Sequence, residues 1–120
     1  MKMHAALVIG MLLATSAGAQ QETETATGAV LRGLDKFSGN VVDIEMRSGL
    51  TATFERLNIT LTECRYPAGN LSGNAFAGLE ITETGRDGTV FSGWMIASAP
   101  ALNAMEHARY DVWVIRCTTS

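Results

Sequence analysis

The sequence predicts a small, mainly β domain, built as an antiparallel barrel or sandwich of about six strands with one short helix. Three observations predict this class. Apolar residues recur at every second position in several segments, turn-forming residues separate these segments, and only one short segment carries helix signals. The 120-residue chain shows no internal repeat, so we expect a single folded domain.

A hairpin is predicted at the start of the domain. Its first strand covers residues 30–36, and residues 38–40 (Ser-Gly-Asn) supply the turn. The second strand follows at 42–47, where apolar and charged side chains alternate. The same spacing of two marks the next strand, which starts at residue 57 and runs toward Cys64.

A surface loop is predicted at residues 66–74, because proline, glycine, asparagine and serine dominate this segment. Two further strands are predicted at 76–84 and 89–97. Between them lies Gly-Arg-Asp-Gly at 85–88, which is a strong hairpin signal.

Two segments in the C-terminal third are apolar on both sides of the expected strand. They cover residues 94–97 and 112–115. Such runs are typical of central strands that are covered on both faces. We therefore expect these two strands to lie in the middle of the sheet structure.

One short helix is predicted between the last two strands. Ser98 is the expected N-cap, and Pro100 suits the first helical turn. Leu102 and Met105 would share one face of about two turns, with His107 near the end. We expect this helix to plug one end of the barrel or sandwich.

The N-terminus has the features of a secretory signal peptide. Lys2 is followed by an almost unbroken apolar run over residues 5–16, and small residues precede a predicted cleavage site after Ala19. The apolar run is too short to span a bilayer, so no membrane span is expected in the exported product. Residues 20–28 lack apolar periodicity and are predicted to form a flexible tail before the domain at 29–120.

The charge of the exported chain gives no reason to expect nucleic acid or anionic lipid as a partner. The sequence has nine basic and twelve acidic residues, and loss of Lys2 leaves eight against twelve, a net charge of minus four. This mild acidity gives no electrostatic attraction to nucleic acid or to anionic lipid.

The two cysteines are expected to form a disulfide. Cys64 and Cys117 both lie in the exported part, and an oxidising compartment favours their pairing. Closing a loop of about 50 residues would stabilise a small domain by about 4 kcal/mol in the chain-entropy model. Two free thiols or a redox pair are the alternatives, although the chain has no Cys-x-x-Cys spacing.

One constellation raises the question of hydrolytic catalysis. His107 is the only histidine after cleavage, Asp111 lies four residues on, and Ser92 or Ser98 would have to supply a nucleophile. The chain has no Gly-x-Ser-x-Gly motif and no glycine-rich oxyanion loop. In the alternative interpretation His107 ends the short helix and hydrogen-bonds the backbone.

No metal or cofactor is expected. One histidine, scattered carboxylates and two cysteines far apart in the sequence give no ligand spacing. The glycines do not form a phosphate-binding loop between a strand and a helix.

Aromatic and methionine side chains are concentrated in the C-terminal third. Tyrosine, tryptophan and methionine often anchor protein interfaces, because they bury large areas at a small entropy cost. We therefore predict an interaction face that consists of Trp94, Met95, His107, Tyr110, Asp111 and Trp113. Packing of the two tryptophans in the core is the alternative, since a small domain needs large residues to fill its interior.

Several motifs resemble those of an uncharacterised bacterial family, DUF2155. The matching segments are 29–36 (Ala-Val-Leu-Arg-Gly-Leu-Asp-Lys), 91–95 (Phe-Ser-Gly-Trp-Met), 98–102, Glu106-His107, 110–114 (Tyr-Asp-Val-Trp-Val) and Cys117. Ala108 departs from the pattern, since many relatives have proline after the Glu-His pair. The resemblance implies a periplasmic protein of Gram-negative bacteria. It implies no established activity, substrate or cofactor.

Three functional hypotheses follow. The leading one is a non-enzymatic interaction module whose face binds an envelope protein or another cell-envelope component. The second is a small hydrolase that uses His107 with Asp111, which requires a serine hydroxyl within reach of the imidazole in an open pocket. The third is a carrier of a small ligand, which requires an enclosed apolar cavity.

Overall fold

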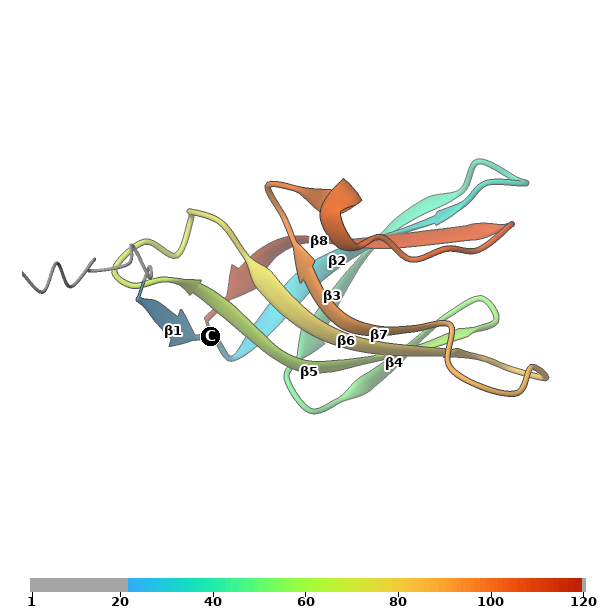
Figure 1. The fold of residues 1–120 in the computed structure, drawn as a ribbon, viewed down its shortest axis with the longest axis horizontal. Helices are drawn as coiled ribbons and strands as arrows, with labels where there is room; N and C mark the ends of the chain where they lie inside the picture. Colours follow the sequence, from blue (N-terminus) through green and yellow to red (C-terminus); the bar gives the residue numbers. More distant parts are fainter. Residues whose placement is uncertain (1–21, 120) are drawn as a thin grey trace, which may run out of the picture.

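The computed structural model of the protein describes residues 22–119 and shows two antiparallel sheets packed face to face (Figure 1). The elements in chain order are β1 (Thr23–Thr25), β2 (Gly28–Asp35), β3 (Val41–Arg47), β4 (Thr51–Phe54), β5 (Leu57–Pro67), β6 (Phe76–Glu83), β7 (Phe91–Ile96), the 3-10 helix η1 (Pro100–Asn103) and β8 (Tyr110–Thr118). The mainly β class predicted from the sequence is confirmed.

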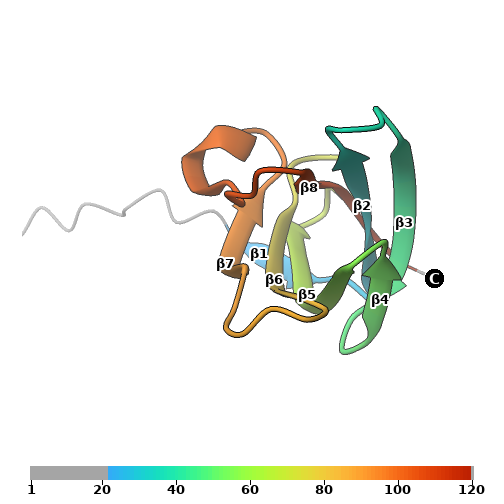
Figure 2. The ribbon, with the colours of Figure 1, turned by 90° about the vertical axis from the view of Figure 1, so that its right-hand side faces the viewer.

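The two sheets divide the chain unequally. The first has the strand order β1-β5-β6-β7, with β4 paired to the N-terminal half of β5, and the second has the order β3-β2-β8. Figure 2 shows the sheets facing each other across the core, with β3 and β7 at outer edges. The structure is therefore a sandwich and not a closed barrel, and it has more strands than the six predicted.

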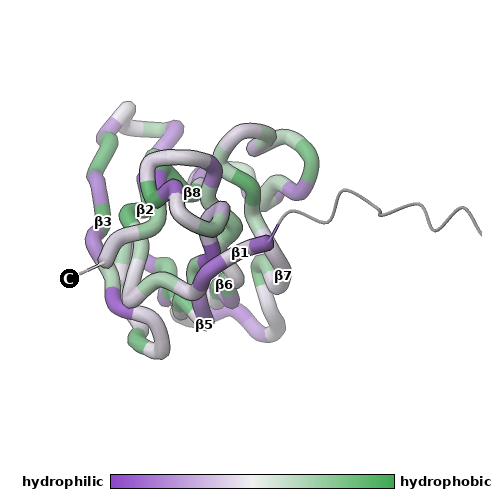
Figure 3. The backbone as a smooth tube through the Cα atoms, turned by 90° about the vertical axis from the view of Figure 1, so that its left-hand side faces the viewer, coloured by the Kyte–Doolittle hydropathy of each residue, from purple (hydrophilic) through white to green (hydrophobic). Residues whose placement is uncertain are grey.

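The predicted hairpins are confirmed. β2 pairs with β3 with Leu31 opposite Ile44, and β6 pairs with β7. The turn between β6 and β7 needs backbone in the left-handed region, and Gly85 and Gly88 supply it with φ of 83° and 85°. The alternation of hydrophilic and hydrophobic residues along the strands can be followed in Figure 3.

The core lies between the two sheets and is built from the inward positions of each strand. Leu31, Leu57, Ile59, Leu61 and Ile81 are completely buried there. β2 supplies the centre of the second sheet, since all eight of its positions from Gly28 to Asp35 are buried or half-buried next to both neighbours. The side chains fill the space between the sheets, as expected for close-packed protein interiors.

Two short strands were not predicted. β1 pairs with the C-terminal end of β5, with Thr25 opposite Arg65, and β4 pairs with the other end of β5. The predicted flexible tail at 20–28 is therefore wrong for the described part from residue 22 onward, because backbone pairing with β5 and β3 orders it. The predicted signal peptide at 1–19 and residues 20–21 lie outside the described residues.

The prediction of two central strands is wrong. β7 lies at the edge of the first sheet and β8 at the edge of the second. Alternate residues of these strands point away from the core. The apolar ones among them, including Trp94 and Trp113, lie on the outer surfaces of the sandwich and are only partly covered. Local composition cannot distinguish such an outward aromatic residue from a second buried face.

The predicted short helix is a single 3-10 turn. Ser98 does not cap it, because Asn74 binds both polar groups of this residue: its amide donates to the Ser98 hydroxyl at 2.8 Å, and its carbonyl oxygen accepts from the Ser98 backbone N–H at 3.0 Å. Within η1, Leu102 points to solvent and is 76% exposed. No helix among the described residues has the length and apolar character needed to cross a membrane.

A disulfide joins the two sheets at one end of the sandwich. Cys64 of β5 and Cys117 of β8 are bonded, with 5.7 Å between their Cα atoms, which lies within the normal range for disulfides. Both residues are buried. The pairing expected from the sequence is present in the structure.

Candidate functional site

The residues predicted to form one interaction face lie in three different environments. Neighbours along a strand point to opposite sides, so Trp94 points outward from β7 while Met95 points into the core and is 2% exposed. On β8, Tyr110 is 1% exposed in the core, whereas Asp111 and Trp113 are half-buried on the outer side. Met95 and Tyr110 are therefore unavailable to a partner of the folded chain.

His107 connects the two sheets at the end opposite the disulfide. Its Nε2 atom lies 2.5 Å from the Glu83 carboxylate at the end of β6. Its Nδ1 atom accepts hydrogen bonds from the backbone N–H groups of Arg109 and Tyr110, at 2.9 and 3.1 Å. Since two donors point at Nδ1, the proton of the neutral ring is on Nε2 and is donated to Glu83.

Glu83 also forms ion pairs with two arginines. Arg86 lies 3.7 Å and Arg56 3.9 Å from its carboxylate oxygens. The hydrogen bond from His107 lowers the pKa of Glu83, and these two cations lower it further against the opposing effect of partial burial. Glu83 is therefore stabilised as a carboxylate.

A second ionic link lies beside the first. Asp35, at the end of β2, is completely buried and forms two hydrogen bonds with the Arg109 guanidinium, at 3.2 and 2.9 Å. The same carboxylate accepts the backbone N–H of Phe37 at 2.9 Å. The Arg109 guanidinium, together with such backbone donors, holds the pKa of Asp35 well below its usual range, although burial opposes this shift.

Glu55 completes this end of the sandwich from the turn between β4 and β5. Its backbone adopts φ of 52°, which is uncommon for a residue other than glycine. Partial desolvation of its carboxyl and a hydrogen bond with Asp35 raise the pKa of Glu55. At the same end, the centroid of the Tyr110 ring lies 5.0 Å from that of His107. The Tyr110 ring also packs edge-on against Phe54, with 5.9 Å between the ring centroids.

The geometry around His107 does not fit the hydrolase hypothesis. Both ring nitrogens are engaged, by Glu83 and by the backbone, and no serine is among the hydrogen-bond partners of the ring within residues 22–119. Asp111, the proposed triad acid, is not among the hydrogen-bond partners of the imidazole within the described residues. The described residues also contain no group of three histidine, cysteine or carboxylate side chains that would hold a metal ion.

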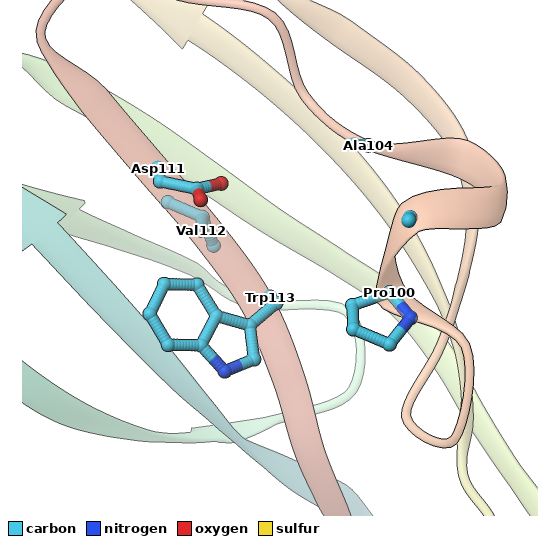
Figure 4. A pocket seen from close by; sticks show the side chains of 6 residues that line it. Pro100, Ala104, Asp111, Val112 and Trp113 are labelled. Atoms are coloured by element: carbon cyan, nitrogen blue, oxygen red, sulfur yellow. The ribbon is translucent and has the colours of Figure 1, made fainter.

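The exposed part of the predicted face borders a hollow between β8 and η1. Figure 4 shows Trp113 and Asp111 on the strand, with Pro100 and Ala104 facing them from the helix side. The hollow measures about 380 Å³ and is also lined by Ala101 and Val112. We call it the η1 groove. Its walls are apolar apart from the Asp111 carboxylate, and the exposed Leu102 belongs to the same helical turn.

Trp94 lies on a different surface, the outer face of the first sheet. It is 44% exposed, and its ring lies across Gly78 of the neighbouring strand β6. A Cβ atom at Gly78 would lie 3.6 Å from the indole and 2.3 Å from the Thr62 hydroxyl, so only glycine fits there without rearrangement. Trp94 is thus neither a core residue nor part of the η1 groove.

Sequence reasoning missed Asp35, Glu83 and Arg109. Glu83 lies 24 positions from His107, and Asp35 lies 74 positions from Arg109. No local spacing connects such partners. Only the position of Asp35 and Glu83 at the ends of predicted strands hinted that they would meet near the same end of the fold.

Comparison with known proteins gives one match. The family model described as "Uncharacterized protein conserved in bacteria (DUF2155)" matches residues 29–117. No curated protein matches the chain. No solved structure matches it either.

Proposed function

The chain belongs to DUF2155, a family of uncharacterised bacterial proteins, and from this premise we propose that it is a non-enzymatic interaction module of the cell envelope. Two observations support an exported, periplasmic location. The N-terminal sequence has the pattern of a cleavable signal peptide, and Cys64 and Cys117 form the kind of disulfide that persists in oxidising compartments.

The η1 groove is the surface on which this proposal rests. It combines an apolar hollow next to Trp113 with Leu102, which is the most exposed large apolar side chain of the described chain. Interface anchors are apolar or aromatic side chains that enter such hollows and leave water behind. At about 380 Å³ the groove is at the small end of the range for binding pockets, which suits a side-chain anchor.

The groove favours one kind of occupant, an extended segment of a partner protein that places an apolar side chain beside a basic residue. Asp111 is the only charged residue among those that line the groove, so a lysine or arginine next to the anchor would find a complementary partner. The net negative charge of the exported chain also favours a positively charged partner.

Two alternatives have less support. A hydrolase would need a free imidazole, but His107 is held between Glu83 and the backbone. A carrier would need an enclosed cavity between the sheets, but side chains such as Leu57, Ile59 and Leu79 fill that space.

Photo-crosslinking in the native periplasm tests the proposal. A photoreactive residue replaces Ala101 in the wild type, in Leu102→Asp and in Asp111→Arg, and the captured proteins are identified by mass spectrometry. We expect one dominant crosslinked protein that both variants reduce at least about tenfold, which corresponds to about 1.4 kcal/mol of binding energy.

Leu50→Asp is the matched control, because Leu50 is also strongly exposed, at 57%, but lies in the β3–β4 turn away from the groove. This variant should capture the same protein as the wild type. Equal loss in Leu50→Asp and Leu102→Asp, or equal capture in all variants, would contradict a docking role for the η1 groove.

A further inference from the structure

The sandwich protects two of its free strand edges with side chains and backbone from a single connection. On the edge of β7, the Trp94 carbonyl accepts the Asn103 side chain at 2.8 Å, and the Ile96 carbonyl accepts the Ala99 N–H at 3.1 Å. On the edge of β8, the Tyr110 N–H donates to His107. The connection from β7 to β8 therefore occupies some of the backbone groups that another strand would need on these two edges.

Within the described part of the chain, the free edge of β3 is closed in this way only at its last residue, where the Arg47 carbonyl accepts the Leu50 N–H at 3.2 Å. The Asp35 N–H donates to Asn40, and the Ser48 N–H donates to Thr27, so hydrogen-bonded pairs begin and end the β2–β3 ladder. Because such pairs alternate along antiparallel strands, the backbone groups of Val41, Asp43 and Glu45 point away from β2. No hydrogen bond from any residue in 22–119 reaches them.

The side chains along this edge are also open to solvent. Val41 is 52% and Val42 39% exposed, although they sit on opposite faces of β3. The hairpin of β2 and β3 extends away from the first sheet at this end, as Figures 1 and 2 show. The edge of β3 near Val41 and Val42 is therefore open to a second extended segment.

We propose that β3 binds an extended segment of a partner protein as an added strand, with basic residues opposite its acidic side. Backbone pairing of this kind is a common mode of peptide recognition. Glu45 makes no ion pair with a described residue, whereas Asp43 already pairs with Arg32 at 2.7 Å. The geometry thus assigns a lysine or arginine of the incoming strand to Glu45 and an apolar residue to exposed Val42. This inference does not depend on the η1 groove.

A second copy of the chain fits this edge poorly. Antiparallel self-pairing of β3 centred on Asp43 or Ile44 would place Asp43 opposite Asp43 or opposite Glu45. Pairing centred on Glu45 would place Glu45 opposite Glu45, and there only the two Asp43–Arg47 pairs would offset the repulsion. Like charges directly opposite each other destabilise a strand pair. A basic segment of a different protein meets no such repulsion, so we assign the edge to that occupant.

Binding of defined peptides tests the proposal. The probe is a capped seven-residue peptide of alternating valine and lysine, compared with its valine–glutamate counterpart and with a form that is N-methylated on the side facing β3. Amide chemical shifts of the folded protein report the binding site. We expect saturable shifts at Val41, Asp43 and Glu45 with the lysine peptide, and binding at least about tenfold weaker for the other two.

Two proline variants separate edge pairing from nonspecific attraction. The Val41 N–H faces the free edge, so Val41→Pro removes a donor for the added strand but no bond of the β2 ladder and no charge. Ser92→Pro is the matched uncharged change on the edge of β7. Binding should fall in Val41→Pro and persist in Ser92→Pro.

Several results would overturn the proposal. They are absence of shifts at β3 with the lysine peptide at millimolar concentration, equal binding of the glutamate or N-methylated peptide, or undiminished binding to a Val41→Pro variant that retains the wild-type amide spectrum elsewhere. In each case the charges of β3 would serve only to keep this edge from pairing.

Discussion

The two ends of the sandwich connect the same pair of sheets with different chemistry. At one end, the disulfide between Cys64 and Cys117 joins β5 to β8 covalently. At the other end, the Glu83–His107 hydrogen bond and the contact of Glu55 with Asp35 reach across between the sheets. One link restrains the chain even when it is unfolded, and the other exists only in the native state.

This difference predicts that the two ends respond to different conditions. A disulfide stabilises mainly by limiting the unfolded ensemble, and it is indifferent to protonation. The Asp35 and Glu83 carboxylates must stay charged to hold Arg109 and His107, so acid weakens these two links. Reduction should therefore weaken the end that contains Cys64, and acid should weaken the end that contains Asp35. The two effects should be largely independent of each other.

Removal of the disulfide has the largest expected effect. The Cys64→Ser, Cys117→Ser double variant loses the restraint on a loop with a sequence separation of 53, which corresponds to about 4 kcal/mol of unfolding free energy. Urea denaturation at neutral pH measures this loss. The wild type with a reductant should unfold at the same urea concentration as the double variant, and a reductant effect that persists in the double variant would exclude this explanation.

Alanine substitution of two glycines of β2 compares the packing at the two ends of the sandwich. The expected loss of stability is smaller than that for removal of the disulfide. A Cβ at Gly28, near the disulfide, would lie 2.2 Å from the Met46 carbonyl oxygen, whereas a Cβ at Gly33 would meet the Phe54 ring at 2.9 Å. A backbone carbonyl cannot turn aside as a ring can. We expect Gly28→Ala to cost more than Gly33→Ala, both within about 1–3 kcal/mol, as measured by urea denaturation. The reverse order would show that the disulfide end yields more easily.

The Asp35 carboxylate gives the smallest of the three expected effects on stability at neutral pH. Its contribution becomes visible when the protein is acidified. The pKa of Asp35 is lowered in the folded state, so its contribution to stability is complete above its unfolded value of about 4 and is lost as the pH falls further. Urea midpoints between pH 7 and pH 3 should fall steeply in the wild type below about pH 4. They should start lower and fall less in Asp35→Asn.

Glu55→Gln provides the control for this pH series. The pKa of Glu55 is shifted upward, so its ionisation opposes folding as the pH rises and has the opposite sign to the Asp35 effect. This variant should keep the acid-dependent loss of stability. A pH profile of Asp35→Asn identical to that of the wild type would show that other carboxylates control the acid response.

The long strands could be predicted because their signal is local. In β3 and β5 the spacing of two between apolar residues indicates which face is buried. β1 and β4 lack this pattern, since Thr23–Thr25 and Thr51–Phe54 are short, threonine-rich strands that depend on pairing with β5. Tertiary pairing, and not composition, makes them strands.

The candidate site was less predictable for a related reason. The concentration of aromatic residues in the C-terminal third could not separate inward Met95 and Tyr110 from outward Trp94 and Trp113. The register of β7 and β8 decides this, and register depends on partners far away in the sequence. The role of His107 likewise became visible only once Glu83 and Arg109 were placed around it.

The pairing of β2 with β8 sets the order in which the protein can fold. β2 finds β3 through a short turn, and hairpins form within about 1–10 μs. Its other neighbour lies at the far end of the chain, with Gly28 opposite Thr118. Such distant contacts slow folding. Until β8 docks, the middle strand of the second sheet is itself an open edge, and during this interval the newly made chain is most exposed to association with the wrong partner.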